Sequence, residues 1–178
     1  MSQAPKPMLS AQEQSARDLG AAKLGLPPSE VELSWGRTNR LGHTNFSVHT
    51  TEFADDWEGD TFRGLHVVET DELLTGDAAL SAVVAKVMPT LSSPTEAETV
   101  LTTIKFYWRG FVDGAILLAD TIDAQQAHAA YPDGTPPVLT MEGKAMVIRF
   151  CTVQTEGDLT EVFSHTLRIE EDGRASLK

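Results

Sequence analysis

The chain of 178 residues contains little cysteine, little positive charge and no long apolar run. Because Cys151 is its single cysteine, the chain can form neither an internal disulfide nor a cysteine-rich zinc cluster. We expect Cys151 to be buried and to pack like a small apolar side chain. The nearest candidate for a membrane span, residues 78–87, includes Lys86 and is shorter than the ~20 apolar residues that a span needs. The first eleven residues contain Pro5 and Pro7 and lack the apolar stretch of a secretory signal. These absences predict a cytoplasmic protein.

The sequence also lacks the short motifs that identify many enzymes and cofactor-binding proteins. It contains no glycine-rich phosphate loop, no GxSxG elbow, no HExxH and no GxGxxG. Asp120 and Asp123 are close in sequence, but acid–base catalysis requires a placed pair of groups with separated pKa values. We therefore expect no cofactor and assign no catalytic residue. Whether the protein is an enzyme stays open, and the motif content favours a non-enzymatic role.

Acidic residues dominate the composition, and they are unevenly distributed. The chain has 26 aspartates and glutamates against 14 lysines and arginines, for a net charge of −12. Residues 51–77 hold nine acidic side chains and one basic side chain, Arg63. Because lysine and arginine supply most of the affinity for phosphate backbones, nonspecific binding of nucleic acid is not expected.

The densest part of this segment carries four carboxylates in six residues: Asp55, Asp56, Glu58 and Asp60. A solvated loop, a docking patch for a basic protein partner and a cation site all fit such a cluster. An EF-hand loop counted from Asp56 fails, because Thr61 stands where glycine is needed and Val67 where the bidentate glutamate is needed. The solvated loop is the favoured structural interpretation, and the docking patch is the favoured functional one.

Sequence patterns predict a helix and three strands in the first 70 residues. Ser10 and Glu13 form a capping box that starts a helix over residues 11–24, and Gly25 ends it. Alternation of apolar and polar residues predicts strands over 31–35, 44–53 and 62–69.

Two further helices and a set of strands are predicted in the remainder. Asp77 is a candidate N-cap for a helix that ends at Pro89. Ser93, with proline next and Glu96 three positions on, predicts the start of another helix, which ends near Gly110 or Gly114. Its apolar stripe consists of Ala97, Val100, Leu101, Ile104, Tyr107, Trp108 and Phe111. A strand over 115–119 and a brief helix within 121–131 follow, and then strands over 138–141, 145–154, 160–170 and 174–177.

This order of elements predicts an α+β fold. We expect residues 1–9 to be a disordered lead-in and residues 10–178 to form a single domain. Its antiparallel sheet is packed on one face by helices and ends in a C-terminal β-meander. A flat sheet and a curved sheet are both consistent with the pattern, and a curved sheet would enclose a pocket.

Three residues are candidates for the lining of such a pocket. His165 alternates onto the same side of its strand as Phe163 and Leu167, where it is either a satisfied core histidine or a ligand contact. Arg149 interrupts an apolar strand and could anchor an anion, or it could lie on a solvated face. Trp108 could form part of the wall, although an aromatic residue at helical spacing is more often core.

The histidines give little support for a metal site. Six steps along an extended strand separate His43 from His49 by about 20 Å, far more than a shared zinc allows. His49 and His66 could meet only if their strands were neighbours in the right register. We expect no metal to be bound.

Two functions therefore remain. The first is a non-enzymatic interaction protein, such as an adaptor, an inhibitor or an immunity-type partner. It uses the acidic segment to bind a protein partner, and a basic partner would suit the charge of that segment. The alternative is a small-molecule-binding or catalytic pocket in a cone-shaped α+β domain, lined by His165, Arg149 and Trp108. The oligomeric state is not predicted.

Overall fold

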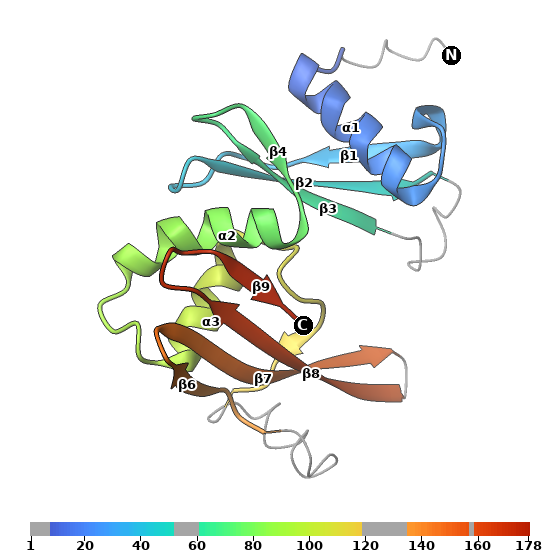
Figure 1. Cartoon of the computed structure of the whole chain (residues 1–178). Helices are drawn as coiled ribbons and strands as arrows, with labels where there is room; N and C mark the ends of the chain where they lie inside the picture. The colour runs from blue at the N-terminus through green and yellow to red at the C-terminus, as the bar shows by residue number, and fades with distance from the viewer. Residues whose placement is uncertain (1–7, 52–60, 119–134, 157–158) are drawn as a thin grey trace. The chain divides into compact units, whose positions relative to one another are not determined.

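The computed structural model describes residues 8–51, 61–118, 135–156 and 159–178. Within them it confirms the α+β class, with three α-helices and two antiparallel sheets. The chain divides into two compact units, residues 1–74 and 75–178. Each unit has its own sheet, whereas the sequence pattern suggested one (Figure 1). That the two units fold together as a single domain stays a prediction.

The first unit is a helix followed by a four-stranded sheet. Its sheet has the order β1-β2-β3-β4, with every neighbouring pair antiparallel. The elements are α1 (Ala11–Leu24), the short 3₁₀ helix η1 (Pro28–Glu30), β1 (Val31–Trp35), β2 (His43–Thr50), β3 (Thr61–Val67) and β4 (Glu72–Leu74). The three-residue strand β4 was not predicted.

The predicted ends of α1 are confirmed. The Ser10 hydroxyl accepts from the backbone N–H of Glu13, and the Glu13 carboxylate accepts from the N–H of Ser10, which completes the capping box. Gly25 ends the helix in the left-handed region at φ 71°. Both ends therefore follow from interactions within a few residues of sequence.

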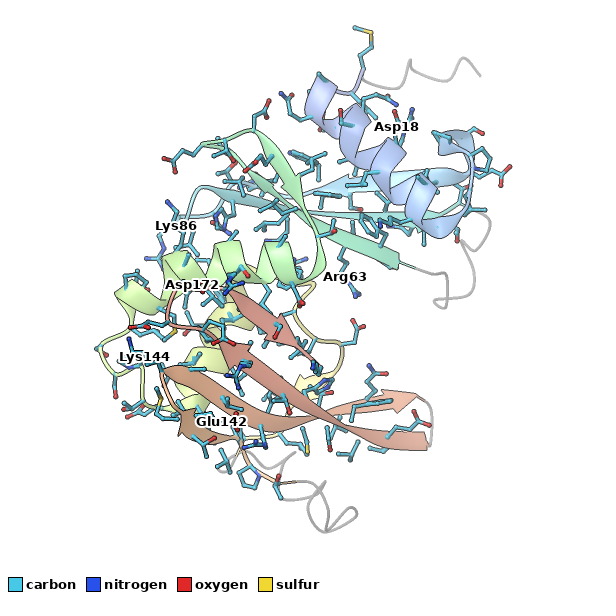
Figure 2. The ribbon with its side chains drawn as sticks, viewed as in Figure 1. Asp18, Arg63, Lys86, Glu142, Lys144 and Asp172 are labelled. Carbon is cyan, nitrogen blue, oxygen red and sulfur yellow. The ribbon has the colours of Figure 1, made fainter. Side chains whose placement is uncertain are left out.

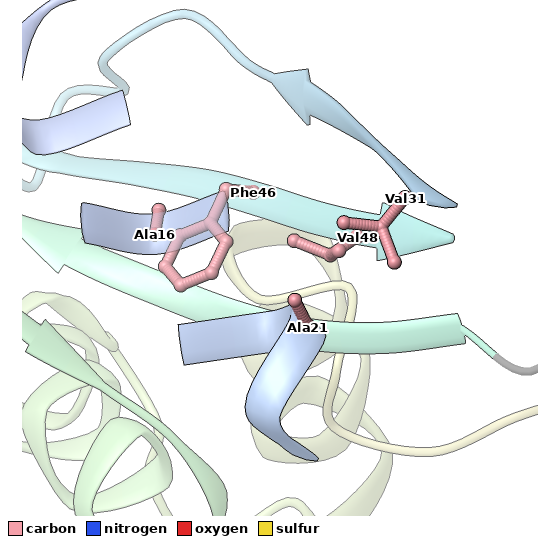
Figure 3. Close-up of a cluster of buried hydrophobic side chains, with 5 residues drawn as sticks. All are labelled: Ala16, Ala21, Val31, Phe46 and Val48. Atoms are coloured by element: carbon pink, nitrogen blue, oxygen red, sulfur yellow. The ribbon is translucent and has the colours of Figure 1, made fainter. Parts of the chain in front are cut away.

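In the core of this unit, large side chains lie directly against the backbone of glycines. α1 contacts β1, β2 and β3, and its Gly20 lies so near Val48 of β2 that a Cβ atom there would overlap the valine. A Cβ on Gly64 would likewise overlap the ring of Phe46, which stacks on Trp35 with ring centroids 5.7 Å apart. Figure 3 shows the buried cluster, which consists of Ala16, Ala21, Val31, Phe46 and Val48.

The second unit places two helices before most of its strands. It contains α2 (Gly76–Val87), the short 3₁₀ helix η2 (Met88–Thr90), α3 (Ala97–Tyr107), β5 (Ala115–Ile116), β6 (Val138–Glu142), β7 (Ala145–Glu156), β8 (Leu159–Ile169) and β9 (Ala175–Leu177). The sheet has the order β5-β7-β8-β9, and β6 also pairs with β7. The predicted C-terminal meander is confirmed as β7-β8-β9.

Bulky aliphatic and aromatic side chains fill the core of this unit. Its fully buried larger residues include Leu80, Val83, Val84, Val87, Leu101, Ile104, Ile148, Phe150 and Leu167. Four of them, at positions 80, 83, 84 and 87, form one apolar stripe of α2, and the stripe that predicted α3 supplies two more. α2 contacts both α3 and β9, so the stripes have the structural role that their spacing indicated.

Side chains of α2 occupy the outer edge of β9. The Ser81 hydroxyl accepts from the N–H of Ala175 at 2.8 Å, and the Asp77 carboxylate accepts from the N–H of Leu177 at 3.3 Å. Asp77 is not the N-cap of α2, because that position is Thr75. The helix therefore protects a sheet edge that would otherwise present unpaired backbone groups.

The predicted start of α3 is wrong by about a turn. The helix begins at Ala97 with Glu96 as N-cap, and no side chain caps it. Ser93 instead lies in a turn, where its carbonyl oxygen accepts from the N–H of Glu96 and its hydroxyl lies 3.2 Å from that of Thr95. α3 ends at Tyr107, earlier than predicted, although Trp108 is buried as its place in the stripe indicated.

None of the helices in the described residues combines the length and apolar character that crossing a membrane requires.

Candidate functional site

A groove in the second unit is the clearest candidate site among the described residues. Its volume is about 430 Å³, within the range of ligand-binding clefts. It is lined by the end of α2, η2, β6, β7 and the turn between β8 and β9: Val84, Ala85, Met88, Pro89, Met141, Lys144, Met146, Ile169, Glu170, Glu171, Asp172 and Gly173.

Three methionines from three different elements dominate the apolar part of the groove. They are Met88 of η2, Met141 of β6 and Met146 of β7. Met141 is 58% exposed, so its thioether is available to a partner. Unbranched, polarizable methionine side chains adapt to differently shaped apolar groups and are common at binding surfaces. This lining suits an apolar side chain or a small apolar ligand.

Charged residues border the apolar lining. The Lys144 ammonium donates to both carboxylate oxygens of Glu171, at 2.7 and 2.8 Å, and Arg174 donates to Asp172 at 2.7 Å. The backbone N–H of Arg174 is the main reason why the pKa of Asp172 is lowered. These pairs are exposed, so each contributes little to stability and can rearrange when a partner binds. Lys144 and Asp172 are labelled in Figure 2.

Arg149, a predicted ligand residue, lies on the sheet surface and does not face this groove. Its guanidinium donates to Glu142 at 3.0 Å, and Arg168 donates to the other oxygen of the same carboxylate at 2.8 Å. The hydrogen bond from Arg149 is the main cause of the lowered pKa of Glu142, and the one from Arg168 adds to it. Arg149 thus belongs to an exposed ion-pair network (Figure 2 labels Glu142).

His165, the second predicted ligand residue, lies on the other face of the same sheet. It is directly opposite Phe150 in the β7–β8 register, and the two rings stack with centroids 5.1 Å apart. Its Nε2 lies 2.8 Å from the hydroxyl of Thr152. Burial lowers the pKa of His165, and the nearby charge of Lys105 lowers it further, so the imidazole is neutral at pH 7.

Strand geometry explains why His165 and Arg149 are not brought together. Side chains alternate between the faces of a sheet, so the residue before Phe150 points to the opposite side from Phe150 and its partner. The structure therefore separates two of the residues that the sequence interpretation had placed in one pocket.

Trp108, the third predicted pocket residue, is a core residue. It is 4% exposed, and its ring packs against Gly110. Its indole Nε1 is buried without a hydrogen-bond partner among the described residues. Phe111 was predicted only as part of a helical stripe. Its ring stacks on that of Phe150 with centroids 5.9 Å apart, and the Phe150 ring in turn stacks on His165.

The four predicted partner-binding residues lie outside the described residues. They are Asp55, Asp56, Glu58 and Asp60.

His49 and His66 are on adjacent strands but do not approach each other. His49 pairs with Thr61, whereas His66 pairs with Thr44, five positions along β2 and on the opposite face. No group of three or more histidine, cysteine, aspartate or glutamate side chains in the described part of the chain could hold a metal ion.

His66 instead pairs with a carboxylate that sequence reasoning missed. Its Nε2 lies 2.8 Å from Asp71, and Gln12 of α1 donates to the other oxygen of Asp71 at 3.0 Å. The hydrogen bond from Gln12 is the first cause of the lowered pKa of Asp71, followed by that from His66. Asp71 has φ 58°, a backbone conformation that aspartate tolerates in turns. These contacts attach the β3–β4 turn to α1.

Comparison with known proteins identifies no relative: no family model, no curated protein and no solved structure matches this chain.

Proposed function

We propose that this chain is a non-enzymatic interaction protein that binds a protein partner through the methionine-lined groove of its second unit. The groove is the single observation that carries the proposal. It combines three adaptable thioethers, one of them 58% exposed, with a border of exposed charged residues. An apolar centre with a polar rim is the usual arrangement of a protein–protein contact.

The acidic segment supplies the second part of the proposal. Asp55, Asp56, Glu58 and Asp60 form the densest cluster of a chain whose net charge is −12. Clustered charge of one sign increases the association rate of an oppositely charged partner and makes that rate dependent on salt. We therefore expect a basic partner, attracted by this segment and held in the groove.

Substitutions in β6 test the groove. Met141→Asp places a charge in the lining, whereas Val138→Asp places the same charge on the same strand at a residue that is 50% exposed and outside the lining. Proteins retained by the wild-type chain at low salt would be identified by mass spectrometry and compared between variants. A partner retained by Val138→Asp but lost by Met141→Asp supports the groove. Equal retention by both variants would contradict it.

Neutralisation of acids tests the segment separately. One variant replaces the four segment acids by asparagine or glutamine, and its control neutralises four exposed acids elsewhere: Asp18, Glu32, Glu96 and Asp113. The segment variant should bind the same partner more slowly and with weaker salt dependence than the control. Identical association rates would remove the segment from the proposal and leave the groove.

A ligand-binding or catalytic site around His165 is the second candidate. The observation in its favour is a neutral, half-buried imidazole whose Nε2 lies 2.8 Å from Thr152. A thermal-shift screen with small acids and apolar metabolites tests it. Because Arg149 is on the opposite face, a stabilising ligand should lose its effect in His165→Ala and keep it in Arg149→Ala. A ligand that depends on neither residue would contradict this candidate.

A further inference from the structure

The outer edge of β8 is only partly covered by β9. Thr166 and Lys178 exchange backbone hydrogen bonds at 2.8 and 3.1 Å, and β9 pairs with residues 167–169. β8 begins seven positions earlier, at Leu159. In Figure 1 the ribbon of β7 and β8 continues past the end of β9. The first half of β8 therefore has a neighbouring strand, β7, on one side only among the described residues.

The hydrogen bonds of Thr166 fix the direction of the backbone groups along this edge. Because the N–H of Thr166 points toward β9, the N–H groups of Ser164 and Val162 point the same way, since the direction repeats every second residue. The hydrogen bonds on the other side of β7 give the same assignment. The Cys151 carbonyl accepts from the N–H of Leu117, which follows β5, so the backbone groups of the preceding residue, Phe150, point toward β8 and pair with His165. Val162 and Ser164 thus direct N–H and C=O groups outward, where the described residues provide no strand to pair with them.

The charge of this edge is unusual for an exposed strand. Natural proteins commonly protect such edges with lysine or proline. From Leu159 to Thr166 the chain contains one carboxylate, that of Glu161, and no lysine, arginine or proline. Glu161 is exposed within the open part, and the neighbouring Phe163 is 39% exposed and offers apolar contact. The edge can therefore accept a strand, and the exposed carboxylate of Glu161 favours one with a positively charged residue beside it.

We propose that the open edge of β8, residues 161–165, binds a basic, extended peptide segment of another protein by strand addition in line with β9. Main-chain hydrogen bonds to Val162 and Ser164 supply the pairing, and the carboxylate of Glu161 supplies the preference for lysine and arginine. This surface lies beyond the groove of the proposed function, since seven steps along β8 from Ile169 to Val162 span about 23 Å.

Two other occupants fit less well. A second copy pairing edge to edge would bring the Glu161 carboxylates of the two chains toward each other, which like-charge repulsion disfavours. The N-terminal residues 1–7 include Lys6, but Pro5 and Pro7 lack the N–H groups that a pairing strand donates. A basic segment of a different chain satisfies both the backbone groups and the charge.

The test uses the full chain and a capped peptide of seven alternating lysine and valine residues. Amide hydrogen exchange should slow by about tenfold or more at Val162 and Ser164 when the peptide is saturating. The amide of Phe163 points toward β7 and is an internal control, because its exchange should change little. A peptide with glutamate in place of lysine should give no protection. Absence of protection at Val162 and Ser164, or equal protection by both peptides, would overturn the proposal.

Variants at the edge separate backbone pairing from simple charge attraction. Ser164→Pro removes an outward N–H that β7 does not use, whereas Ser164→Ala keeps it, so only the proline variant should lose binding. Glu161→Lys should weaken binding of the lysine peptide without touching the backbone, and it keeps the test valid if the proline variant does not fold. Binding that is unchanged in Glu161→Lys and in folded Ser164→Pro would contradict strand addition.

Sedimentation of the wild type and of Ser164→Pro shows whether a second copy of the chain occupies the edge instead. A dimer that dissociates in a folded Ser164→Pro variant, together with no protection by the lysine peptide, would assign the edge to a second copy and overturn the proposal. A monomeric wild type that binds the peptide supports it. Met141→Asp should bind this peptide normally, so failure of the groove and failure of the edge give different results.

Discussion

The two compact units have the same antiparallel pairing but differ in how closely glycines and large side chains are packed in their cores. In residues 1–74, two glycines allow large neighbours to approach the backbone: Gly20 lies against Val48, and Gly64 lies under Phe46. In residues 75–178, branched and aromatic side chains of both helices and the sheet fill the interior. The first unit should therefore be damaged most by added atoms, and the second by removed atoms.

The largest effect is expected from the removal of atoms in the second unit. Ile148→Ala deletes a fully buried side chain of β7 and should lower the free energy of unfolding by about 2–5 kcal/mol. Urea denaturation measures the loss. As a matched control, Met141→Ala on the neighbouring strand β6 removes an exposed side chain and should have a much smaller effect. Equal losses would show that burial does not control stability here.

The addition of one methyl group should damage the first unit. The new Cβ in Gly64→Ala overlaps the Phe46 ring, which is held by Trp35, and we expect a loss of about 1–3 kcal/mol. Hydrogen exchange measured over both units shows where the loss occurs. If the units unfold as one domain, amides of both lose protection; if they unfold separately, only residues 1–74 do.

A second substitution tests the cause of that loss. Phe46→Leu makes space for the methyl group, so the double variant should be more stable than the sum of the two single effects predicts. Additive losses would mean that the damage arises from the backbone of β3 and not from the ring.

The link between α2 and β9 should have an intermediate effect. Ser81→Ala leaves the N–H of Ala175 without its acceptor and should cost about 1–2 kcal/mol. Amide exchange at Ala175 should become faster than at Arg168 of the neighbouring strand. Unchanged exchange at Ala175 would indicate that another group replaces the serine.

The capping box of α1 gives a smaller effect in the first unit. Ser10→Ala removes the acceptor for the N–H of Glu13 and should cost about 1 kcal/mol. Ser93→Ala, at the site where the sequence pattern wrongly predicted a cap, should cost clearly less. A reversed order in urea denaturation would contradict the assignment of the caps.

The smallest effect concerns pH and the second unit. Burial holds the pKa of folded His165 below its usual 6.5, so the unfolded chain binds more protons just below that value. The stability that His165 contributes is complete above about pH 6.5 and is lost as the pH falls through the lower folded pKa. A His165→Gln variant should lack this part of the pH dependence. An identical pH profile in wild type and variant would contradict it.

Local features and the C-terminal meander could be predicted from the sequence, whereas features that depend on the register between strands could not. The Ser10 box was predicted because both partners lie within one helical turn. The Ser93 pattern failed because Thr95 and Glu96 form a turn there, which the letters of a capping motif do not reveal. The strand β4 has only three residues, too few to show an alternating pattern.

The site residues show the same limit more clearly. Alternation along β8 correctly placed His165 on the same face as Leu167. Whether Arg149 of β7 shares that face depends on the register between the two strands, in which Phe150 and not Arg149 lies opposite His165. The groove was missed because Met88 is more than fifty positions from Met141 and Met146, and only the fold makes them neighbours. Residue types can indicate which chemistry is available, but the register between strands determines which side chains lie next to each other.

The contact between Phe46 and Gly64 also constrains which substitutions the two positions accept during evolution. In any lineage that shares this fold, a side chain at position 64 should cost less stability after the ring at position 46 has been replaced by a smaller group. The two positions should therefore change together, in a preferred historical order, as should positions 20 and 48. Such paired exchanges would show that the same packing contact is kept in chains whose other residues have diverged.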